Sequence, residues 1–206
     1  AHMSVNLHYE DKARAAGFSS VCGVDEAGAG PLMGPVYAAA VILPDNCDLH
    51  GLNDSKKLTE KKREALFPLV QQQALAWSVA SVSAREIDDT DILSARMKAM
   101  QLAIDGLSQK PDLALIDGNR DRGRCAAILT PHRCIISGDS LSASIAAASV
   151  LAKVSRDRYM LELDKQYPQY QLAKHKGYPT KLHYELIAQY GIQPFYRRSF
   201  LKKQGY

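Results

Sequence analysis

The sequence predicts an α/β fold in which helices cover the faces of a central sheet. Short apolar runs alternate along the chain with longer segments whose apolar residues recur at three- and four-residue steps. The connections between these segments are short and rich in turn-forming residues. Such alternation is typical of layered α/β domains, in which the strands gather into one sheet.

Length and composition predict one globular domain. The chain has 206 residues and a mass of 22.7 kDa, with 46% hydrophobic and 23% charged residues. These values allow a sizeable core. The formal net charge is +4 and the sequence pI is about 8.8, which is compatible with a nucleic-acid partner without being specific for one. Because no heptad pattern stands out, we expect a monomer.

Cysteine usage and the lack of long apolar runs predict a cytoplasmic protein. Cys22, Cys47, Cys125 and Cys134 form no Cys-x-x-Cys pair, so we expect four reduced thiols. No apolar run is long enough to cross a bilayer, and no signal-peptide pattern opens the chain, so we expect no membrane association. Residues 1–3 are typical of the remnant of an expression tag and are excluded from the fold prediction.

The chain is organised around its first predicted strand, residues 21–24. This apolar run leads directly into Asp25 and Glu26, and a loop that contains Gly28 and Gly30 follows. Glycine lets a backbone approach a ligand closely, and adjacent carboxylates suit a hard cation. The commoner interpretation of an Asp-Glu pair is a surface turn, but the apolar runs on both sides favour a ligand site.

The middle of the chain predicts strands and helices in alternation. The predicted elements are a strand over 36–43, a helix over 59–73, a strand over 77–82 and a helix over 92–107. Thr59 is a candidate N-cap for the first helix. An apolar stripe on that helix consists of Leu66, Leu69 and Val70. The stripe on the second helix consists of Leu93, Met97, Met100, Ile104 and Leu107, and it predicts core packing rather than a cofactor site.

Two more short strands are predicted, over 113–116 and 134–136, and each leads into a carboxylate, Asp117 and Asp139. A long helix is expected over 142–167. Its alanine run has little bulk and should pack closely on a sheet.

The last part of the chain predicts a small helical region that begins at about residue 160. Its final regular helix is expected over 180–190, with Gly191 at the C-terminus. The tail over 197–203 is basic.

Carboxylates that follow predicted strands are the candidate chemistry of this chain. Ligands gather outside strand ends in layered α/β folds, so Asp25, Glu26, Asp117 and Asp139 could converge there. Packed carboxylates repel one another unless cations neutralise them. Two Mg²⁺ ions held there could clamp a phosphodiester for in-line attack by water. For Asp117 or Asp139 alone, an acidic turn residue beside glycine is the commoner interpretation.

Basic residues gather later in the chain and offer a second candidate surface. Each is more often a solvated charge, and phosphate binding is the functional alternative. The residues are Lys153, Arg156, Lys174, His175, Lys176, Arg197 and Arg198. His175 could carry a proton or be a polar loop residue. Tyr178 follows a Lys-Gly turn and could stack on a sugar or base, although a lone tyrosine more often fills core or surface space.

Six segments, in this order, are similar to those of bacterial ribonuclease HII, a type 2 ribonuclease H family. The first, VCGVDEAGAGPLMGPV, holds the Asp-Glu pair and the glycine loop. The segments are residues 21–36, 53–58, 115–119, 138–157, 175–178 and 198–200. Together they span nearly the whole chain, which makes the resemblance specific.

The resemblance implies a ribonuclease H-like fold, with a central mixed sheet flanked by helices and a small C-terminal helical part. It implies metal-dependent hydrolysis of the RNA-containing strand of RNA/DNA hybrids and of DNA duplexes with embedded ribonucleotides. The products would carry 5′-phosphate and 3′-hydroxyl ends. Such an activity would act in DNA replication and ribonucleotide excision repair. The implied cofactors are Mg²⁺ or Mn²⁺, two ions per site, held by the catalytic carboxylates Asp25, Glu26, Asp117 and Asp139.

The resemblance also implies which residues contact the substrate. The glycine loop would sense the ribose 2′-hydroxyl, the group that distinguishes RNA from DNA. The tyrosine would stack on the sugar beside the RNA–DNA junction, whereas Asp157 is expected to be structural. The implied substrate-binding residues are Gly28, Ala29, Gly30, Asn53, Ser55, Lys56, Ser144, Lys153, Lys176 and Tyr178.

Two positions depart from the family pattern, and both remove a positive charge. The family has Gly-Arg-Gly where this chain has Ala29 between the glycines, and a lysine where this chain has Ser137. We therefore expect a preference for RNA stretches at RNA–DNA junctions over single embedded ribonucleotides. Two alternatives stay open at this point. One is a weakly active protein that binds ribonucleotide-containing duplexes, and the other is a metal-dependent hydrolase of small phosphate esters.

Overall fold

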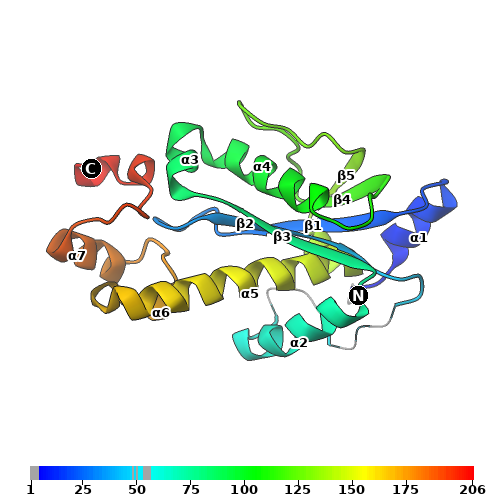
Figure 1. Cartoon of the computed structure of the whole chain (residues 1–206), viewed down its shortest axis with the longest axis horizontal. Coiled ribbons are helices and arrows are strands. Elements are labelled where there is room, and N and C mark those ends of the chain that lie inside the picture. Colours follow the sequence, from blue (N-terminus) through cyan, green and yellow to red (C-terminus); the bar gives the residue numbers. More distant parts are fainter. Residues whose placement is uncertain (1–4, 48, 50, 53–56) are drawn as a thin grey trace.

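The computed structural model describes residues 5–47, 49, 51–52 and 57–206. Within them, a five-stranded sheet has the order β3-β2-β1-β4-β5, with helices above and below it (Figure 1). The strands are β1 Val21–Ala27, β2 Val36–Ile42, β3 Ala76–Val82, β4 Leu113–Asp117 and β5 His132–Ile135. The α-helices are α1 His8–Ala15, α2 Glu60–Gln73, α3 Ala84–Asp89, α4 Ile92–Asp105, α5 Ala143–Gln166, α6 Leu172–His175 and α7 Lys181–Tyr190. Short 3-10 turns are η1 Gly138–Ser140, η2 Pro168–Tyr170, η3 Arg198–Phe200 and η4 Lys202–Gln204.

The sheet is mixed, as expected. β1 pairs antiparallel with β2, and β2 with β3, whereas β1 pairs parallel with β4, and β4 with β5. Val24 of β1 lies opposite Ile116 of β4. The next residues, Asp25 and Asp117, therefore reach the same edge of the sheet.

Alternate side chains of the central strands enter two separate cores. On β2, Ala38 and Ala40 pack with α4, while Ala39 and Val41 pack with α5. Figure 1 shows α4 on one side of the sheet and α5 and α2 on the other. This alternation is what a strand buried on both faces requires.

The long helix α5 approaches the sheet as closely as its small residues allow. Ala146, Ala147 and Ala148 are buried against β2. At Gly23, an added Cβ would lie 2.2 Å from the backbone carbon of Ser144, so β1 needs a glycine where the N-terminus of α5 crosses it. The expected close packing is confirmed.

Some local expectations hold and others do not. Thr59 does cap α2, because its Oγ1 accepts a hydrogen bond from the Lys62 amide at 3.2 Å. The placing of Leu69 in the buried stripe of α2 was wrong, since Leu69 is 40% exposed. The helices α1 and α3 were not predicted. α3 has only six residues, and α1 buries Glu10, which interrupts an apolar pattern.

The C-terminal helices form a separate core that packs on the loop between β1 and β2. Met33 of this loop is buried together with Met160, Tyr170 and Tyr196. Backbone hydrogen bonds join the two parts, including one from the Leu32 amide to the Gly177 carbonyl at 2.8 Å. The C-terminal part thus fixes the loop that follows the Asp-Glu pair. No helix in the described part of the chain is both long and apolar enough to cross a membrane.

Candidate active site

Three carboxylates that lie far apart in the sequence meet at one edge of the sheet. Asp25 lies near the end of β1, Asp117 ends β4, and Asp139 lies in η1. One oxygen from each lies within 4.8 Å of the others. The Asp139 amide donates to Asp117 Oδ1 at 3.1 Å, which ties η1 to β4. The cluster is therefore built by the pairing of β1 with β4 and by the turn after β5.

Burial and mutual repulsion make this cluster suited to a cation. Burial, followed by the charge of Asp117, raises the pKa of Asp25 well above its usual value. Burial, followed by the charge of Asp139, raises the pKa of Asp117. A divalent cation would favour the ionised form of all three groups. A set of carboxylate oxygens fits Mg²⁺ or Mn²⁺ rather than a soft metal.

Glu26 lies beside the cluster but is not one of the three grouped side chains. It follows Asp25 on the strand, and its Oε1 lies 3.0 Å from Nε of Arg96 on α4. Burial raises the pKa of Glu26, and the Arg96 charge opposes that rise. The structure thus brings together three of the four predicted carboxylates and holds the fourth in an ion pair next to them.

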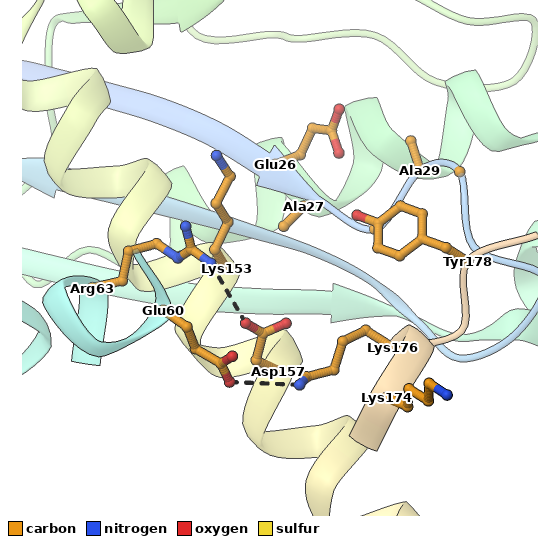
Figure 2. A pocket seen from close by; sticks show the side chains of 12 residues that line it. Glu26, Ala27, Ala29, Glu60, Arg63, Lys153, Asp157, Lys174, Lys176 and Tyr178 are labelled. Atoms are coloured by element: carbon orange, nitrogen blue, oxygen red, sulfur yellow. Dashed lines mark ion pairs between the residues drawn. The ribbon is translucent and has the colours of Figure 1, made fainter. Parts of the chain in front are cut away.

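A groove of about 670 Å³ extends from Glu26 across α2, α5 and the turn after α6 (Figure 2). Charged side chains of both signs line it, and some pair across it. Lys176 Nζ lies 3.5 Å from Glu60 Oε1, and Arg63 Nη2 lies 4.0 Å from Asp157 Oδ2. The lining residues are Glu26, Ala27, Gly28, Ala29, Gly30, Glu60, Arg63, Lys153, Asp157, Lys174, Lys176 and Tyr178.

The glycine loop lines the groove, and Arg197 fixes its backbone. This side chain donates hydrogen bonds of 2.7 to 3.1 Å to the carbonyl oxygens of Gly28, Ala29, Pro31 and Gly34. Burial, followed by the charge of Arg156, lowers the pKa of Arg197 to about 9, so it stays charged at neutral pH. Because each peptide is planar, fixing these carbonyls also fixes the direction of the neighbouring N–H groups.

Gly28 meets a second buried arginine. Its φ is +92°, and an added Cβ would lie 2.3 Å from Nε of Arg156. Arg156 donates to the Lys176 carbonyl at 2.9 Å and to the Met33 carbonyl at 3.2 Å. Arg156 therefore connects the glycine loop to the turn that carries Tyr178.

The prediction that Arg156 and Arg197 are solvated or phosphate-binding charges was wrong. They are 2% and 0% exposed, and their guanidinium groups are used by backbone carbonyls. His175 is likewise neither a loop residue nor a candidate proton carrier, because it is buried with hydrogen bonds on both ring nitrogens. The sequence shows these residue types but not their burial.

The turn that presents Tyr178 rests on a stacked pair of histidines. The Gly177 amide donates to His175 Nδ1 at 3.0 Å, and His175 Nε2 contacts the Tyr170 carbonyl at 2.6 Å. The ring of His183 stacks on His175, with centroids 3.9 Å apart, and its Nδ1 contacts the Tyr178 carbonyl at 3.0 Å. Tyr178 itself is 47% exposed and faces the groove.

The other predicted substrate contacts are divided between the groove and the core. Gly28, Ala29, Gly30, Lys153, Lys176 and Tyr178 line the groove. Ser144 does not, because it is 1% exposed and its Oγ donates to Glu10 Oε2 at 2.6 Å. Asn53, Ser55 and Lys56 lie outside the described residues.

Sequence reasoning missed three charged residues of the groove or beside the cluster, Glu60, Arg63 and Arg96. Glu60 and Arg63 stand three positions apart in the first turn of α2, so they share one face of that helix. Arg96 interrupts the apolar pattern of α4 beside Met97. A charged residue directly beside an apolar stripe was the signal in the sequence that could have identified Arg96.

Comparison with known proteins points to one family. The family model described as Ribonuclease HII matches residues 22–203. A protein named ribonuclease HII from Vibrio parahaemolyticus is 55% identical over 184 residues, which cover 89% of this chain and 85% of that protein. A relative of the same name from Vibrio vulnificus is 54% identical over 184 residues, with 89% and 87% covered.

Solved structures support the same family and confirm the expected ribonuclease H-like fold. The ribonuclease H2 of Pyrococcus horikoshii superposes with a TM-score of 0.73 at 28% identity, covering 88% of this chain and 93% of that one. The ribonuclease HII of Archaeoglobus fulgidus, solved in complex with PCNA, gives a TM-score of 0.72 at 26% identity, with 87% and 94% covered. Bst-RNase HIII, solved with Mn²⁺, shares the fold, with a TM-score of 0.58 at 19% identity over 84% of this chain and 63% of that one.

Proposed function

Because this chain belongs to the ribonuclease HII family, we propose that it is an endonuclease that depends on divalent cations and cuts the ribonucleotide-containing strand of a duplex. Its substrates are RNA/DNA hybrids and DNA duplexes with embedded ribonucleotides, and its products carry 5′-phosphate and 3′-hydroxyl ends. The observation that carries the proposal is the meeting of Asp25, Asp117 and Asp139 within 4.8 Å of one another, beside a groove.

The carboxylates of Asp25, Asp117 and Asp139 would hold Mg²⁺ or Mn²⁺, with Glu26 next to them. When bound, two such ions supply positive charge to the scissile phosphate and lower the pKa of the attacking water. The protein's part is to hold the carboxylates in place before the substrate arrives. The carboxylates are held by the hydrogen bond from the Asp139 amide to the Asp117 carboxylate and by the pairing of β1 with β4.

The glycine loop and Tyr178 are proposed to select the ribonucleotide. Arg197 fixes the peptide planes at Gly28 and Ala29, which orients loop N–H groups toward a ribose 2′-hydroxyl. An added Cβ at Gly30 would lie 3.8 Å from the Tyr178 ring, so the loop and the ring form one continuous wall. The ring then stacks on the sugar at the junction. Ala29 and Tyr178 both line the groove (Figure 2).

Lysines of the groove are proposed to bind the phosphate backbone. Lys153 and Lys176 line the groove. In the ion pair between Lys176 and Glu60, Nζ lies 3.5 Å from Oε1 of an exposed carboxylate. Replacing this carboxylate by a phosphate of the substrate therefore costs little free energy. Asn53, Ser55 and Lys56 complete the proposed set of contacts, and Ser144 is withdrawn from it because it is buried.

The preference within this substrate class is proposed to follow from Ala29 and Ser137. Neither residue offers a charge to the scissile region, so a single ribonucleotide has fewer contacts than a run of them. We therefore propose that RNA stretches at RNA–DNA junctions are cut faster. The same two residues favour a second candidate function, the binding of ribonucleotide-containing duplexes with little turnover. We further propose that the protein acts as a monomer in the cytoplasm.

A panel of labelled duplexes tests the proposed function. Duplexes with one ribonucleotide, four ribonucleotides or none are incubated with the protein and Mg²⁺ or Mn²⁺. We expect cleavage of both ribonucleotide-containing duplexes, faster for four, and none of the DNA-only duplex. Excess chelator should abolish cleavage, and Ca²⁺ should not replace Mg²⁺, because its looser coordination does not align the reacting groups. Binding without turnover under all metal conditions would favour the second candidate, and cleavage of the DNA-only duplex would contradict both.

A further inference from the structure

The connection between β4 and β5, residues 118–131, carries an unassigned basic surface. Arg120, Arg122 and Arg124 occupy alternate positions, and all three are exposed. The side chain of Arg122 is 79% exposed. The connection begins directly after Asp117, a member of the carboxylate cluster. The connection thus begins at the candidate active site and carries three positive charges that do not line the groove.

This connection is an ordered hairpin rather than an open loop. Arg122 forms a β-bridge with Ala127. The Gly123 amide donates to the Ala126 carbonyl at 2.7 Å, and the Ile128 amide donates to the Asp121 carbonyl at 2.8 Å. The Cys125 amide donates to Ser94 Oγ at 2.8 Å, which docks the hairpin on the start of α4. Figure 1 shows it, in yellow-green, on the α4 side of the sheet.

The docking forces the arginines outward. Asp121 faces His132, with its Oδ2 3.1 Å from Nε2 of the ring. At Gly123, an added Cβ would lie 2.5 Å from the backbone nitrogen of Ser94. Because alternate residues of an extended segment face opposite ways, Arg122, which lies between these two positions, faces solvent. Arg124 is exposed in the bend at the tip of the hairpin, and Arg120 is exposed before the hairpin begins.

Nearby acids neutralise this series only in part. Arg122 Nε lies 3.6 Å from Asp121 Oδ1, which is a loose and exposed pair. Arg124 makes a minor contribution to the lowered pKa of Asp91, behind the hydrogen bonds from Ser94. The Cys134 thiol lies 3.7 Å from the Arg120 carbonyl, so Arg120 lies beside β5, the strand that leads to Ser137.

We propose that Arg120, Arg122 and Arg124 form a phosphate-binding edge for the duplex that flanks the cleavage position. This rests on the proposed function and adds a contact surface to it, on the β5 side of the cluster. Arginine suits this role because its planar group can donate two hydrogen bonds to one phosphate. The edge supplies positive charge on the side where Ser137 supplies none.

Paired double variants test the proposal. R122Q/R124Q removes two charges from the edge. K12Q/K110Q removes two charges from exposed positions at the opposite end of the sheet, before β1 and β4 begin. Long-range attraction falls equally in both variants, so the difference between them reports local contacts. Binding to labelled duplexes is measured by anisotropy without divalent cation, across about 50 to 300 mM salt.

We expect R122Q/R124Q to lower the slope of log Kd against log salt by about 1.8, at about 0.9 per phosphate. The control variant should keep nearly the wild-type slope. In cleavage assays, KM should rise about tenfold with kcat unchanged, because a contact remote from the reacting bond stabilises bound substrate and transition state equally. The difference between the two double variants should disappear when the duplex is shortened on one side of the cleavage position. It should persist when the duplex is shortened on the other side.

Equal slopes and equal KM values for the two double variants would overturn the proposal. R122K/R124K checks against a folding defect, since it keeps both charges and should retain most of the wild-type salt slope. A slope as low as that of R122Q/R124Q would show that hairpin structure, not charge, is responsible. Because DNA-only duplexes can be used for the binding series, failure of the proposed cleavage activity would be seen separately, in the duplex panel.

Discussion

Arg197 illustrates how one buried side chain can set the geometry of a whole loop. Its guanidinium group contacts four backbone carbonyls between β1 and β2. Lysine carries the same charge but cannot reproduce this fork. We predict that Arg197→Lys lowers the free energy of unfolding by roughly 2–4 kcal/mol, because buried acceptors lose their donors. It should also slow the cleavage of ribonucleotide-containing duplexes, because the N–H groups of the loop lose their fixed direction.

The neighbouring Arg198 provides the matched control, since it is exposed. Arg198→Lys should leave the urea midpoint and the rate of cleavage of ribonucleotide-containing duplexes close to those of the wild type. If the two variants behave alike in both measurements, Arg197 does not organise the loop.

Ala29 is the residue at which we expect a substitution to change the substrate preference. Its carbonyl bonds to Arg197 and its side chain borders the groove, so a longer side chain has room to enter. We predict that Ala29→Arg raises kcat/KM on a single ribonucleotide by roughly tenfold to hundredfold, the effect of a charged hydrogen bond of about 1.5–3 kcal/mol. The gain on a four-ribonucleotide stretch should be smaller.

Both duplexes are assayed for both proteins at one fixed salt concentration, since phosphate contacts depend on salt. An equal change on the two duplexes would mean that Ala29 does not set the preference. Ser137→Lys is the next variant to compare, because the family has a positively charged lysine where this chain has Ser137.

At the scale of an element, the turn that carries Tyr178 depends on two neutral histidines. Tyr178 receives its position from contacts with His175 and His183, and the hydroxyl of Tyr196 lies 2.8 Å from His183 Nε2. Burial, followed by the neighbouring His175, lowers the pKa of His183 to about 4, and burial also lowers the pKa of His175. Protonation of His175 at Nδ1 would remove the acceptor of the Gly177 amide, and burial disfavours a charge on either ring.

We predict that the free energy of unfolding falls as the pH drops from about 6.5 to about 4. In this window the unfolded chain binds a proton at His183, with an ordinary pKa of 6.5, which the folded chain does not bind. The loss from His183 reaches roughly 3 kcal/mol, at about 1.4 kcal/mol per pKa unit. Urea unfolding at several pH values measures it.

His183→Gln should be less stable at pH 7 but should lose less further stability on acidification. His8→Gln, at an exposed histidine of α1, is the control for the loss of a histidine. A His183→Gln curve parallel to the wild-type curve would contradict the proposed origin of the acid sensitivity.

Elements also show where sequence prediction stops. Each predicted strand is present, because apolar runs and turn residues mark strands locally. The backbone conformation just before Asp139 was less predictable, because Ser137 has a left-handed backbone with φ of 56° and leads into a 3-10 turn. That geometry arises from hydrogen bonds such as Ser142 N to Gly138 O, at 2.7 Å, and no local pattern predicts it.

For the whole molecule, the sequence predicted the layers and the identity of the acidic residues but not the sheet order. The order β3-β2-β1-β4-β5 depends on pairings between segments about ninety residues apart, such as Val21 with Leu113. The burial of Arg156 and Arg197 depends on the same tertiary packing. Residue types and spacing therefore predicted that carboxylates would meet at the edge of the sheet, but they did not predict the buried arginines that support the neighbouring loop.

Replacement of Asp25 by asparagine shows whether the acidic cluster cuts ribonucleotide-containing duplexes. Asparagine keeps the size of the side chain and removes the charge that a cation requires. The measurement is single-turnover cleavage of a duplex with four ribonucleotides in Mg²⁺, with binding of the same duplex measured in parallel. We predict that the variant binds the duplex like the wild type, because phosphate contacts dominate affinity, and that it does not cut it. Near-normal turnover by Asp25→Asn would contradict the account.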